Sequence, residues 1–467
     1  MTRKKPPPAS GLDHTFKTLH ARSKEELAAL LVELAATHPE VETRLVRDAL
    51  AADPPRLAAQ FRQRLQTWRR SRRFLMSSAA GTFGRELESW LDEIERELLP
   101  LDPARAHKLA EAFVCSDERF FEQADDSDGA IGDAVRAGCR LWLRAAKAQP
   151  DRSATDWIER VYALANADEY GAREALLQYA DTLFDAPSLR ALAGRFEEDL
   201  DRALRHRGKG EHPNHAVFKA AAAIALIADA LRDPDLSTKA TLRYSPSPNS
   251  LQKEHFVERY IRFGRPGEAL AWLEGDWGGH EEQRERLLVE AYAALSDTVR
   301  LRSVLRALFE RTGSPDDFEA WHVILDPADR AGAVAEARDR AWRVDDPITG
   351  AQLLLALKDD KAAEALLVAR HASLRGEQYY RLVPLAETLE RNGRLVGAVV
   401  CYRALLVAIL TRAYGRAYGH AAKYLGALRR LDPQVGDYRP LPTHEAFEAS
   451  LRNTHARKVS FWNRAGG

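Results

Sequence analysis

The sequence is poor in cysteine, in long apolar runs and in net charge. Its 467 residues include three cysteines, Cys115, Cys139 and Cys401, and none lies at a short spacing from another. Three such thiols cannot form a disulfide framework or a zinc knuckle within one chain, so we expect a reducing, cytoplasmic location. The apolar run from Leu395 to Leu410 contains Arg403, and we therefore expect no membrane-spanning helix.

An excess of charge of one sign is also missing. The chain carries 69 basic and 69 acidic residues, which gives a formal net charge of zero. This balance excludes a globally basic nucleic-acid binder. Arginine outnumbers lysine by 55 to 14. Arginine can recognise phosphate through paired contacts, but the equal acid content favours an ordinary surface role for most of these residues.

Helical periodicity is present along almost the whole chain. The leucines between Leu27 and Leu34 recur at the spacing of one helix face, behind a capping box of Ser23 and Glu26. Asp102 and Pro103 predict another helix start. No run of alternating β-branched residues occurs. We therefore predict an all-α protein.

A stretch rich in proline divides the helical pattern. Pro234, Pro246 and Pro248 lie in a segment with little apolar periodicity. The first eleven residues contain three successive prolines and no apolar run, so we expect a tail there and no signal peptide. The predicted organisation is a disordered tail over 1–11, an N-terminal helical domain over 12–235, a linker or long loop over 236–250, helical repeats over 251–432, and a C-terminal extension over 433–467 that caps the array.

The repeat prediction depends on five similar segments. They begin at Arg265, Thr298, Ala331, Lys361 and Arg394, at intervals of 33, 33, 30 and 33 residues. Three of them follow a pair of residues typical of turns. The interval is close to the 34-residue period of tetratricopeptide helix pairs. We predict a tetratricopeptide-like solenoid or superhelix; the alternative is an irregular helical array.

Four segments resemble a known family. They are Ser23–Leu45 (SKEELAALLVELAATHPEVETRL), Asp125–Asp133 (DDSDGAIGD), His420–Leu431 (HAAKYLGALRRL) and His444–Trp462, which contains HARKVSF. Together they resemble an uncharacterised bacterial family, a domain of unknown function that also occurs beside SWIM zinc-finger domains. The resemblance implies a helical-repeat protein without an assigned activity and supplies no catalytic residues. The chain lacks the zinc ligands of those neighbours.

An arginine block is the first candidate site. No acidic residue lies between Asp53 and Glu86, whereas eight arginines do. On a continuous helix Arg62, Arg69 and Arg73 would share a face that could bind phosphates or an acidic partner. The alternative, which we favour, is that the acidic stretch 86–102 pairs with the block and cancels its charge.

The C-terminal segment is the second candidate site. His455, Arg457 and Lys458 lie close to Phe461 and Trp462, a mixture that suits nucleic-acid stacking or an anionic peptide. The alternative, again favoured, is that the two aromatic residues fold back and cap the helical array.

No motif indicates a catalytic, cofactor or metal site. The segment Asp125–Gly129 lacks the first and last carboxylates of a calcium loop, so a turn that caps the following helix explains it better. No HExxH, GxSxG or GxGxxG pattern occurs. We therefore expect a non-enzymatic scaffold that binds a protein partner in a groove between stacked helices. The alternative is a nucleic-acid-associated protein that uses the arginine block and the C-terminal segment.

Overall fold

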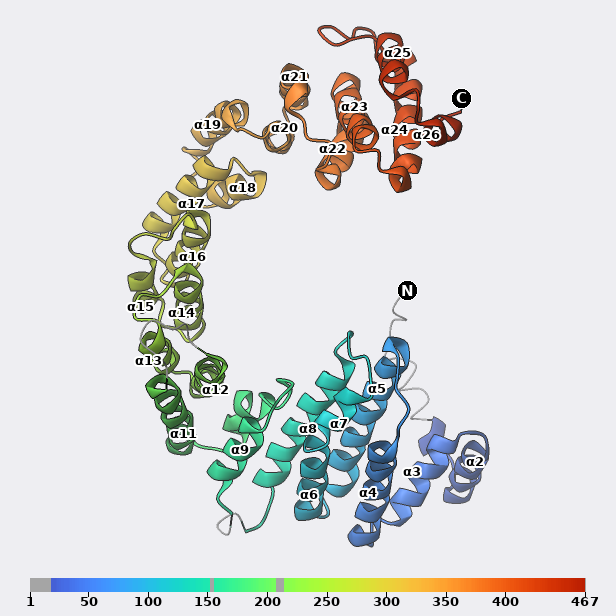
Figure 1. The fold of residues 1–467 in the computed structure, drawn as a ribbon, viewed down its shortest axis with the longest axis vertical. Coiled ribbons are helices and arrows are strands. Elements are labelled where there is room, and N and C mark those ends of the chain that lie inside the picture. The colour runs from blue at the N-terminus through green and yellow to red at the C-terminus, as the bar shows by residue number, and fades with distance from the viewer. Residues whose placement is uncertain (1–17, 152–154, 207–213, 467) are drawn as a thin grey trace. The chain divides into compact units, whose positions relative to one another are not determined.

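The protein is helical throughout the parts that the structure describes. A computed structural model describes residues 18–151, 155–206 and 214–466, and the predicted tail over 1–11 lies outside them. These residues form helices and no strand, apart from one isolated bridge between Leu75 and Ala124. The all-α prediction is confirmed. The chain divides into two compact units, residues 1–248 and 249–467, which we call the N-terminal and C-terminal units (Figure 1).

The N-terminal unit contains helices of very different length. They are α2 (Lys24–Thr37), α3 (Pro39–Ala49), α4 (Pro54–Arg70), α5 (Ser77–Glu93), the π-helix η1 (Ile94–Leu98), α6 (Pro103–Val114), α7 (Asp117–Glu122), α8 (Ala130–Lys147), α9 (Trp157–Asn166), α10 (Ala175–Gln178), the 3₁₀ turn η2 (Ala180–Thr182), α11 (Ala186–Arg205), α12 (His215–Leu231) and α13 (Pro234–Tyr244).

Short polar side chains fix where many of these helices begin. The Asp102 carboxylate accepts a hydrogen bond from the backbone N–H of Arg105, with Pro103 in the first turn, as the sequence predicts. Asn214 caps α12 in the same way by accepting from Val217. Such caps satisfy backbone donors that have no partner inside the helix.

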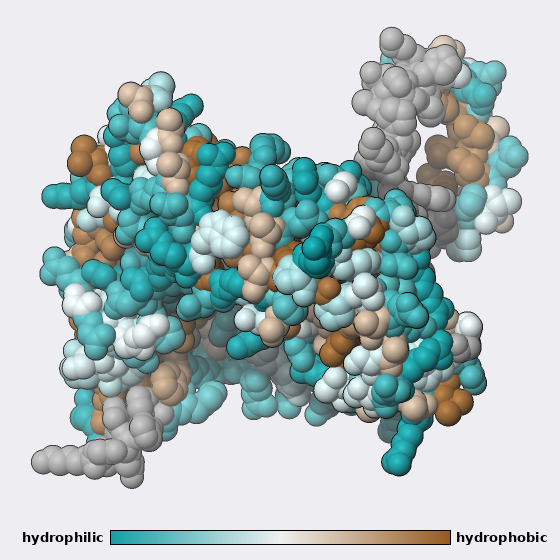
Figure 2. All heavy atoms as spheres, turned by 90° about the horizontal axis from the view of Figure 1, so that it is seen from above, coloured by the Kyte–Doolittle hydropathy of each residue, from teal (hydrophilic) through white to brown (hydrophobic). Residues whose placement is uncertain are grey.

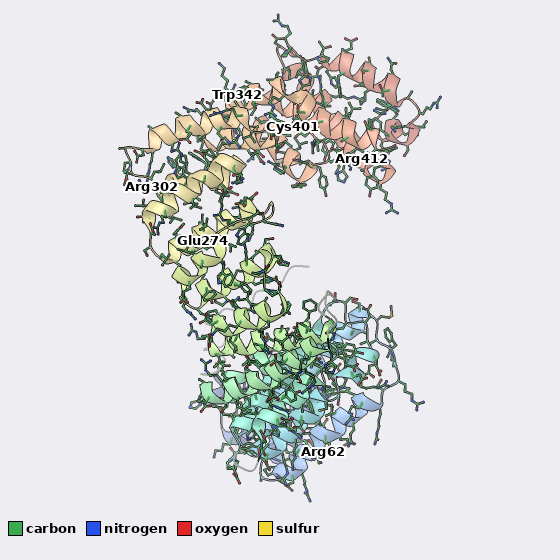
Figure 3. All side chains as sticks on the ribbon, turned by 60° about the vertical axis from the view of Figure 1, so that its left-hand side comes forward. Arg62, Glu274, Arg302, Trp342, Cys401 and Arg412 are labelled. Atoms are coloured by element: carbon green, nitrogen blue, oxygen red, sulfur yellow. The ribbon has the colours of Figure 1, made fainter. Side chains whose placement is uncertain are left out.

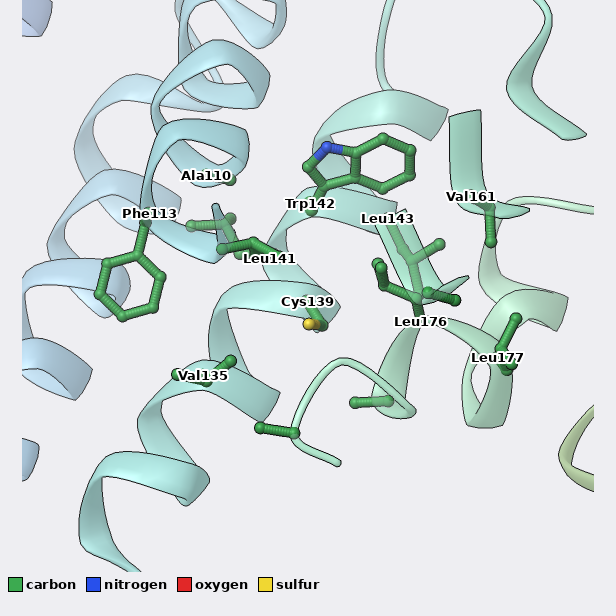
Figure 4. Packing of buried hydrophobic residues seen from close by; sticks show 14 of the residues in the cluster. Ala110, Phe113, Val135, Cys139, Leu141, Trp142, Leu143, Val161, Leu176 and Leu177 are labelled. Carbon is green, nitrogen blue, oxygen red and sulfur yellow. The ribbon is translucent and has the colours of Figure 1, made fainter. Parts of the chain in front are cut away.

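The core of the N-terminal unit is built around α8. Figure 4 shows Val135, Cys139 and Trp142 of α8 among side chains of neighbouring helices, including Phe113 of α6. Two glycines allow this close packing. A Cβ atom on Gly138 would lie 2.6 Å from the Phe113 ring, and one on Gly84 would lie 2.7 Å from the backbone of Ala130.

The first leucine-rich helix is less buried than its pattern suggests. The capping box of Ser23 and Glu26 is present at the start of α2. However, α2 contains no buried residue, and Leu31 and Val32 remain 42% and 67% exposed. The periodicity therefore predicted the helix correctly, although among the residues described here nothing covers its apolar stripe completely.

The segment 236–250, predicted as a linker or long loop, is helical over more than half of its length. Helix α13 occupies Pro234–Tyr244, and its Ser237, Thr238 and Ala240 are buried. Small residues give no strong apolar stripe, yet they allow close packing, and the Ser237 hydroxyl donates to the carbonyl of Pro234. The division between the two units nevertheless falls inside the predicted segment, between Pro248 and Asn249.

The C-terminal unit contains successive pairs of helices. The members are α14 (Ser250–Arg262) with α15 (Pro266–Ala269) and η3 (Leu270–Leu273), α16 (Glu281–Ala294) with α17 (Thr298–Thr312), α18 (Pro315–Val323) with α19 (Arg330–Arg343), α20 (Pro347–Ala356) with α21 (Asp360–Ala369), and α22 (Tyr379–Arg391) with α23 (Leu395–Thr411). The five similar segments of the sequence correspond to the second helical segment of each pair.

The same turn joins four of these five pairs. Its central residue has a left-handed backbone: Gly264, Ser296, Lys358 and Gly393 have φ angles of 74°, 56°, 61° and 71°. The next residue donates its N–H to the carbonyl five positions earlier, as from Arg394 to Leu389 at 2.8 Å. This Schellman arrangement satisfies carbonyls at the end of the first helix. The helix pairs thus share a local geometry as well as a spacing.

The chain ends with helices that pack against the last pair. They are η5 (Gly415–Ala417), α24 (Tyr418–Leu431), η6 (Asp432–Gln434), α25 (His444–His455) and α26 (Val459–Arg464). A further short helix, η4 (His371–Ser373), lies between α21 and α22. Phe461 and Trp462 of α26 are buried, and the Phe461 ring meets Tyr418 of α24 edge-on. Among the helices described, none is long and apolar enough to span a membrane.

Candidate interaction surfaces

The arginine block begins on α4, whose apolar side faces the core. Leu57, Phe61 and Leu65 are buried, whereas Arg62 and Arg69 are exposed; Figure 3 labels Arg62. The continuous helical face predicted for Arg62, Arg69 and Arg73 is wrong for Arg73. The helix ends at Arg70, because the chain then turns away to form the bridge between Leu75 and Ala124.

Internal compensation of the arginine block is slight. One ion pair connects the block to the acidic stretch 86–102, with Arg64 Nη1 3.7 Å from Glu93 Oε2. The acids of that stretch pair mainly with other arginines: Arg47 contacts both Glu93 and Glu97, and Arg144 contacts Glu95. The favoured prediction that the two stretches cancel each other is therefore wrong.

Aromatic packing explains this outcome. Trp68 of α4 meets Phe83 and Trp90 of α5 with ring centroids 6.0 and 5.7 Å apart, and Phe61 also meets Trp90. Because these large rings fill the space between α4 and α5, Arg64 is the one arginine of α4 with an ion pair to an acid of α5 among the described residues.

Between residues 62 and 73, five arginines of the block are exposed and form no ion pair with any residue in the described part of the chain. We call them the arginine surface: Arg62, Arg69, Arg70, Arg72 and Arg73. Two large apolar side chains follow them closely in the chain, Phe74 at 56% and Met76 at 67% exposure. Positive charge and exposed apolar groups thus occur together here.

The acidic turn after α7 has a structural role. The Asp126 carboxylate accepts from the backbone N–H groups of Ile131 and Gly132, at 2.8 and 3.0 Å. It therefore caps α8, as predicted. Asp128 accepts a hydrogen bond from Ser77 Oγ at 3.0 Å, close in sequence to Met76. No cluster of potential metal ligands occurs in the part of the chain that the structure describes.

The C-terminal candidate residues do not form an open stacking platform. Trp462 is 8% exposed, its Nε1 donates to the His455 carbonyl, and the Arg452 guanidinium lies 4.4 Å from its ring centroid. Arg457 is exposed and Lys458 is half-buried. Burial lowers the pKa of His455. The two aromatic residues fold back onto the unit, as the favoured alternative predicts.

A groove in the C-terminal unit was missed by sequence reasoning. It has a volume of about 470 Å³ and lies between the segment 371–377, helix α23 and the segment 441–447. Cys401 and Arg412, labelled in Figure 3, mark the middle of α23 and the position just after its end. Arg403 contributes to the groove wall. The signal in the sequence was this single charge within an apolar run.

The surface in Figure 2 is mostly hydrophilic on the face in view, with hydrophobic residues scattered between polar ones. The structure thus has three features: successive helix pairs, an arginine surface with no ion pairs to the described residues, and a groove with a buried arginine.

The chain belongs to the family of unknown function DUF6880, whose sequence profile matches residues 14–464. No curated protein and no solved structure matches the chain.

Proposed function

We propose that the protein is a cytoplasmic, tetratricopeptide-like scaffold that binds an acidic segment of another protein through its arginine surface. The observation that carries this proposal is the arginine surface itself, five exposed arginines within residues 62–73 that form no ion pair with a described residue. Exposed arginines that form no ion pair create a positive potential that attracts an anionic partner. The proposed role involves no catalytic step.

The recurring turn supports the scaffold part of the proposal. The same left-handed residue and backbone hydrogen bond recur at Gly264, Ser296, Lys358 and Gly393. Arrays of similar helix pairs offer extended surfaces for protein recognition.

An acidic protein segment suits this surface better than a nucleic acid. Phe74 and Met76 add apolar area, and methionine adapts readily to protein partners. The acidic turn with Asp126 and Asp128 lies beside the segment that contains Leu75, because Leu75 pairs with Ala124. Nearby carboxylates would repel a long phosphate backbone more than a short peptide.

Nucleic-acid binding remains the second candidate function. It is favoured by the number of unpaired arginines, since arginine contacts phosphate through two parallel hydrogen bonds. The C-terminal segment adds little to it because Trp462 is buried.

The test measures binding of two fluorescent probes to the full chain by anisotropy. One probe is a short peptide that alternates glutamate and leucine, and the other is a single-stranded oligonucleotide. The variant Arg62→Ala/Arg69→Ala/Arg73→Ala removes the arginine surface, and Arg22→Ala/Arg205→Ala/Arg232→Ala is the control with three other exposed arginines. We expect the first variant to bind the peptide about tenfold more weakly and the control to bind normally.

Other outcomes would overturn the proposal. Tight binding of the oligonucleotide with no binding of the peptide would support the nucleic-acid alternative instead. Equal loss in both variants would indicate a general charge effect, and no binding of either probe would contradict both functions.

A further inference from the structure

Arg403 is a buried cation inside an apolar helix. It is the one charged residue of α23 and is 8% exposed. Its guanidinium lies over two rings, 4.5 Å from the centroid of Phe447 and 5.3 Å from that of Tyr438. Its Nη1 donates to the Pro442 carbonyl at 2.9 Å. Cation–π contacts and a hydrogen bond to a neutral carbonyl stabilise a buried guanidinium less than an ion pair with a carboxylate does.

No acidic residue in the described part of the chain forms an ion pair with this guanidinium. The Nε and Nη2 groups are buried without a hydrogen-bond partner. Burial lowers the pKa of Arg403, although Tyr438 and Asp432 oppose the shift. A buried cation with unused donors is costly unless an anion joins it.

The groove beside Arg403 has mainly apolar walls. Leu374, Val407, Pro442 and Phe447 line it, and Val407 is 38% exposed. Gly376 lets the segment before α22 approach α23 closely, since a Cβ atom there would lie 2.5 Å from the Cβ of Ala408. Such a space suits an apolar side chain next to a charged group.

Two other ionisable groups line the groove. Glu377 is the one acid among the lining residues, and its Oε1 lies 3.5 Å from Arg412 Nε. His371 donates from Nδ1 to the Val368 carbonyl at 2.9 Å. Glu377 is therefore engaged with a different arginine, and Arg403 is left for an external anion.

We propose that this groove binds the C-terminal carboxylate of a partner protein whose last residues are apolar. The carboxylate accepts from the unused Nε and Nη2 groups of Arg403, Nη1 keeps its bond to the Pro442 carbonyl, and the apolar side chains pack beside Val407 and Phe447. A chain end suits the site because the groove is small and offers a single buried cation. The site lies in the C-terminal unit, so it is independent of the arginine surface.

The test uses the full chain and three small probes. They are N-acetyl-leucyl-leucine with a free carboxylate, the same molecule as its amide, and N-acetyl-glutamyl-leucine amide, whose carboxylate is on the side chain. Binding is followed by NMR of the arginine Nε–H groups. We expect the free acid to bind at least about tenfold more tightly than either amide and to shift the Arg403 signal.

Two groove variants and one control make the test specific. Arg403→Gln removes the cation, and Val407→Asp places a competing carboxylate in the groove without removing the arginine. Val459→Asp introduces the same charge at a residue that is 61% exposed and does not line the groove. We expect both groove variants to lose binding and the control to keep it.

Several results would overturn this inference. The first is that N-acetyl-leucyl-leucine and its amide bind equally well, or that the probe with a side-chain carboxylate binds as well as the free acid. The others are that Val459→Asp loses as much affinity as the groove variants, or that no probe binds. If Arg403→Gln fails to fold, Val407→Asp with the intact arginine decides the question. Loss of the arginine surface leaves this binding unchanged, so the two proposals fail separately.

Discussion

Arg429 holds Glu448 through a paired ion contact between α24 and α25. Its Nε lies 3.2 Å from one carboxylate oxygen and its Nη2 lies 2.8 Å from the other. The remaining nitrogen, Nη1, donates to the carbonyl of Ala465 at 2.7 Å. One side chain thus connects α24, α25 and the end of the chain.

The substitution Glu448→Gln should destabilise the protein at neutral pH. The Arg429 hydrogen bonds lower the pKa of Glu448 from 4.5 to about 2. A carboxylate with a lowered pKa contributes stability above its unfolded pKa and loses it as pH falls towards the folded value. We expect a loss of about 1 kcal/mol at pH 7, allowing for solvent screening.

Urea unfolding across pH tests this expectation. The difference between wild type and Glu448→Gln should shrink as pH falls from 4.5 towards 2. Glu445→Gln, at an exposed position in the first turn of the same helix, is the control. A difference that does not change with pH would contradict the charge-based explanation.

His107 should make the N-terminal unit less stable in mild acid. Burial lowers its pKa from 6.5 to about 4, and its ring lies among Trp142 and Trp157 with centroids 4.7 and 5.2 Å away. Between these two pH values His107 binds a proton in the unfolded chain but stays neutral in the folded chain. The free energy of unfolding therefore falls as the pH drops through this window.

The corresponding experiment compares wild type with His107→Gln. We expect the wild type to lose about 2 kcal/mol between pH 6.5 and 4 relative to the variant, less than the full shift implies because the site is partly solvated. Parallel pH profiles of the two proteins would show that His107 keeps an ordinary pKa.

The glycine at position 84 should be needed for close packing of α5 against α8. Its added Cβ would lie 2.7 Å from the backbone carbonyl of Ala130. We expect Gly84→Ala to destabilise by about 2 kcal/mol. Gly194→Ala in α11 is the matched control, because nothing lies within 4 Å of its Cβ. This control should stabilise by about 1 kcal/mol, and a similar effect at both positions would contradict the packing argument.

The recurring turn of the C-terminal unit predicts opposite effects at two equivalent positions. Gly393 and Lys358 have left-handed φ angles of 71° and 61°. Gly393→Ala should therefore cost about 1 kcal/mol, whereas Lys358→Gly should stabilise by up to about 1 kcal/mol. Chemical denaturation of both variants measures this, and a destabilising Lys358→Gly would indicate that the lysine side chain has another role.

Local patterns predicted much of the fold. The helix start at Asp102 and Pro103, the cap at Asp126 and the second helical segments of the five pairs all follow from interactions within a few residues. Helix α13 was missed because Ser237, Thr238 and Ala240 are buried by packing that gives no strong apolar stripe.

The candidate sites depended on contacts between distant residues and were predicted less well. Sequence proximity suggested that the acids after Glu86 would pair with the arginine block. However, the rings of Trp68 and Trp90 separate the two groups, and Arg47 and Arg144 take the acids. The groove at Arg403 required Phe447 and Pro442 from a later segment, which no periodicity in α23 reveals.

The salt dependence of peptide binding tests the proposed role most directly. The dissociation constant of the glutamate–leucine peptide is measured across a salt series for wild type and for Arg62→Ala/Arg69→Ala/Arg73→Ala. Because salt screens exposed charges, we predict that wild-type affinity falls with salt and that the variant binds weakly with a much smaller salt dependence. Identical curves for the two proteins would contradict the claim that the arginine surface binds an acidic partner.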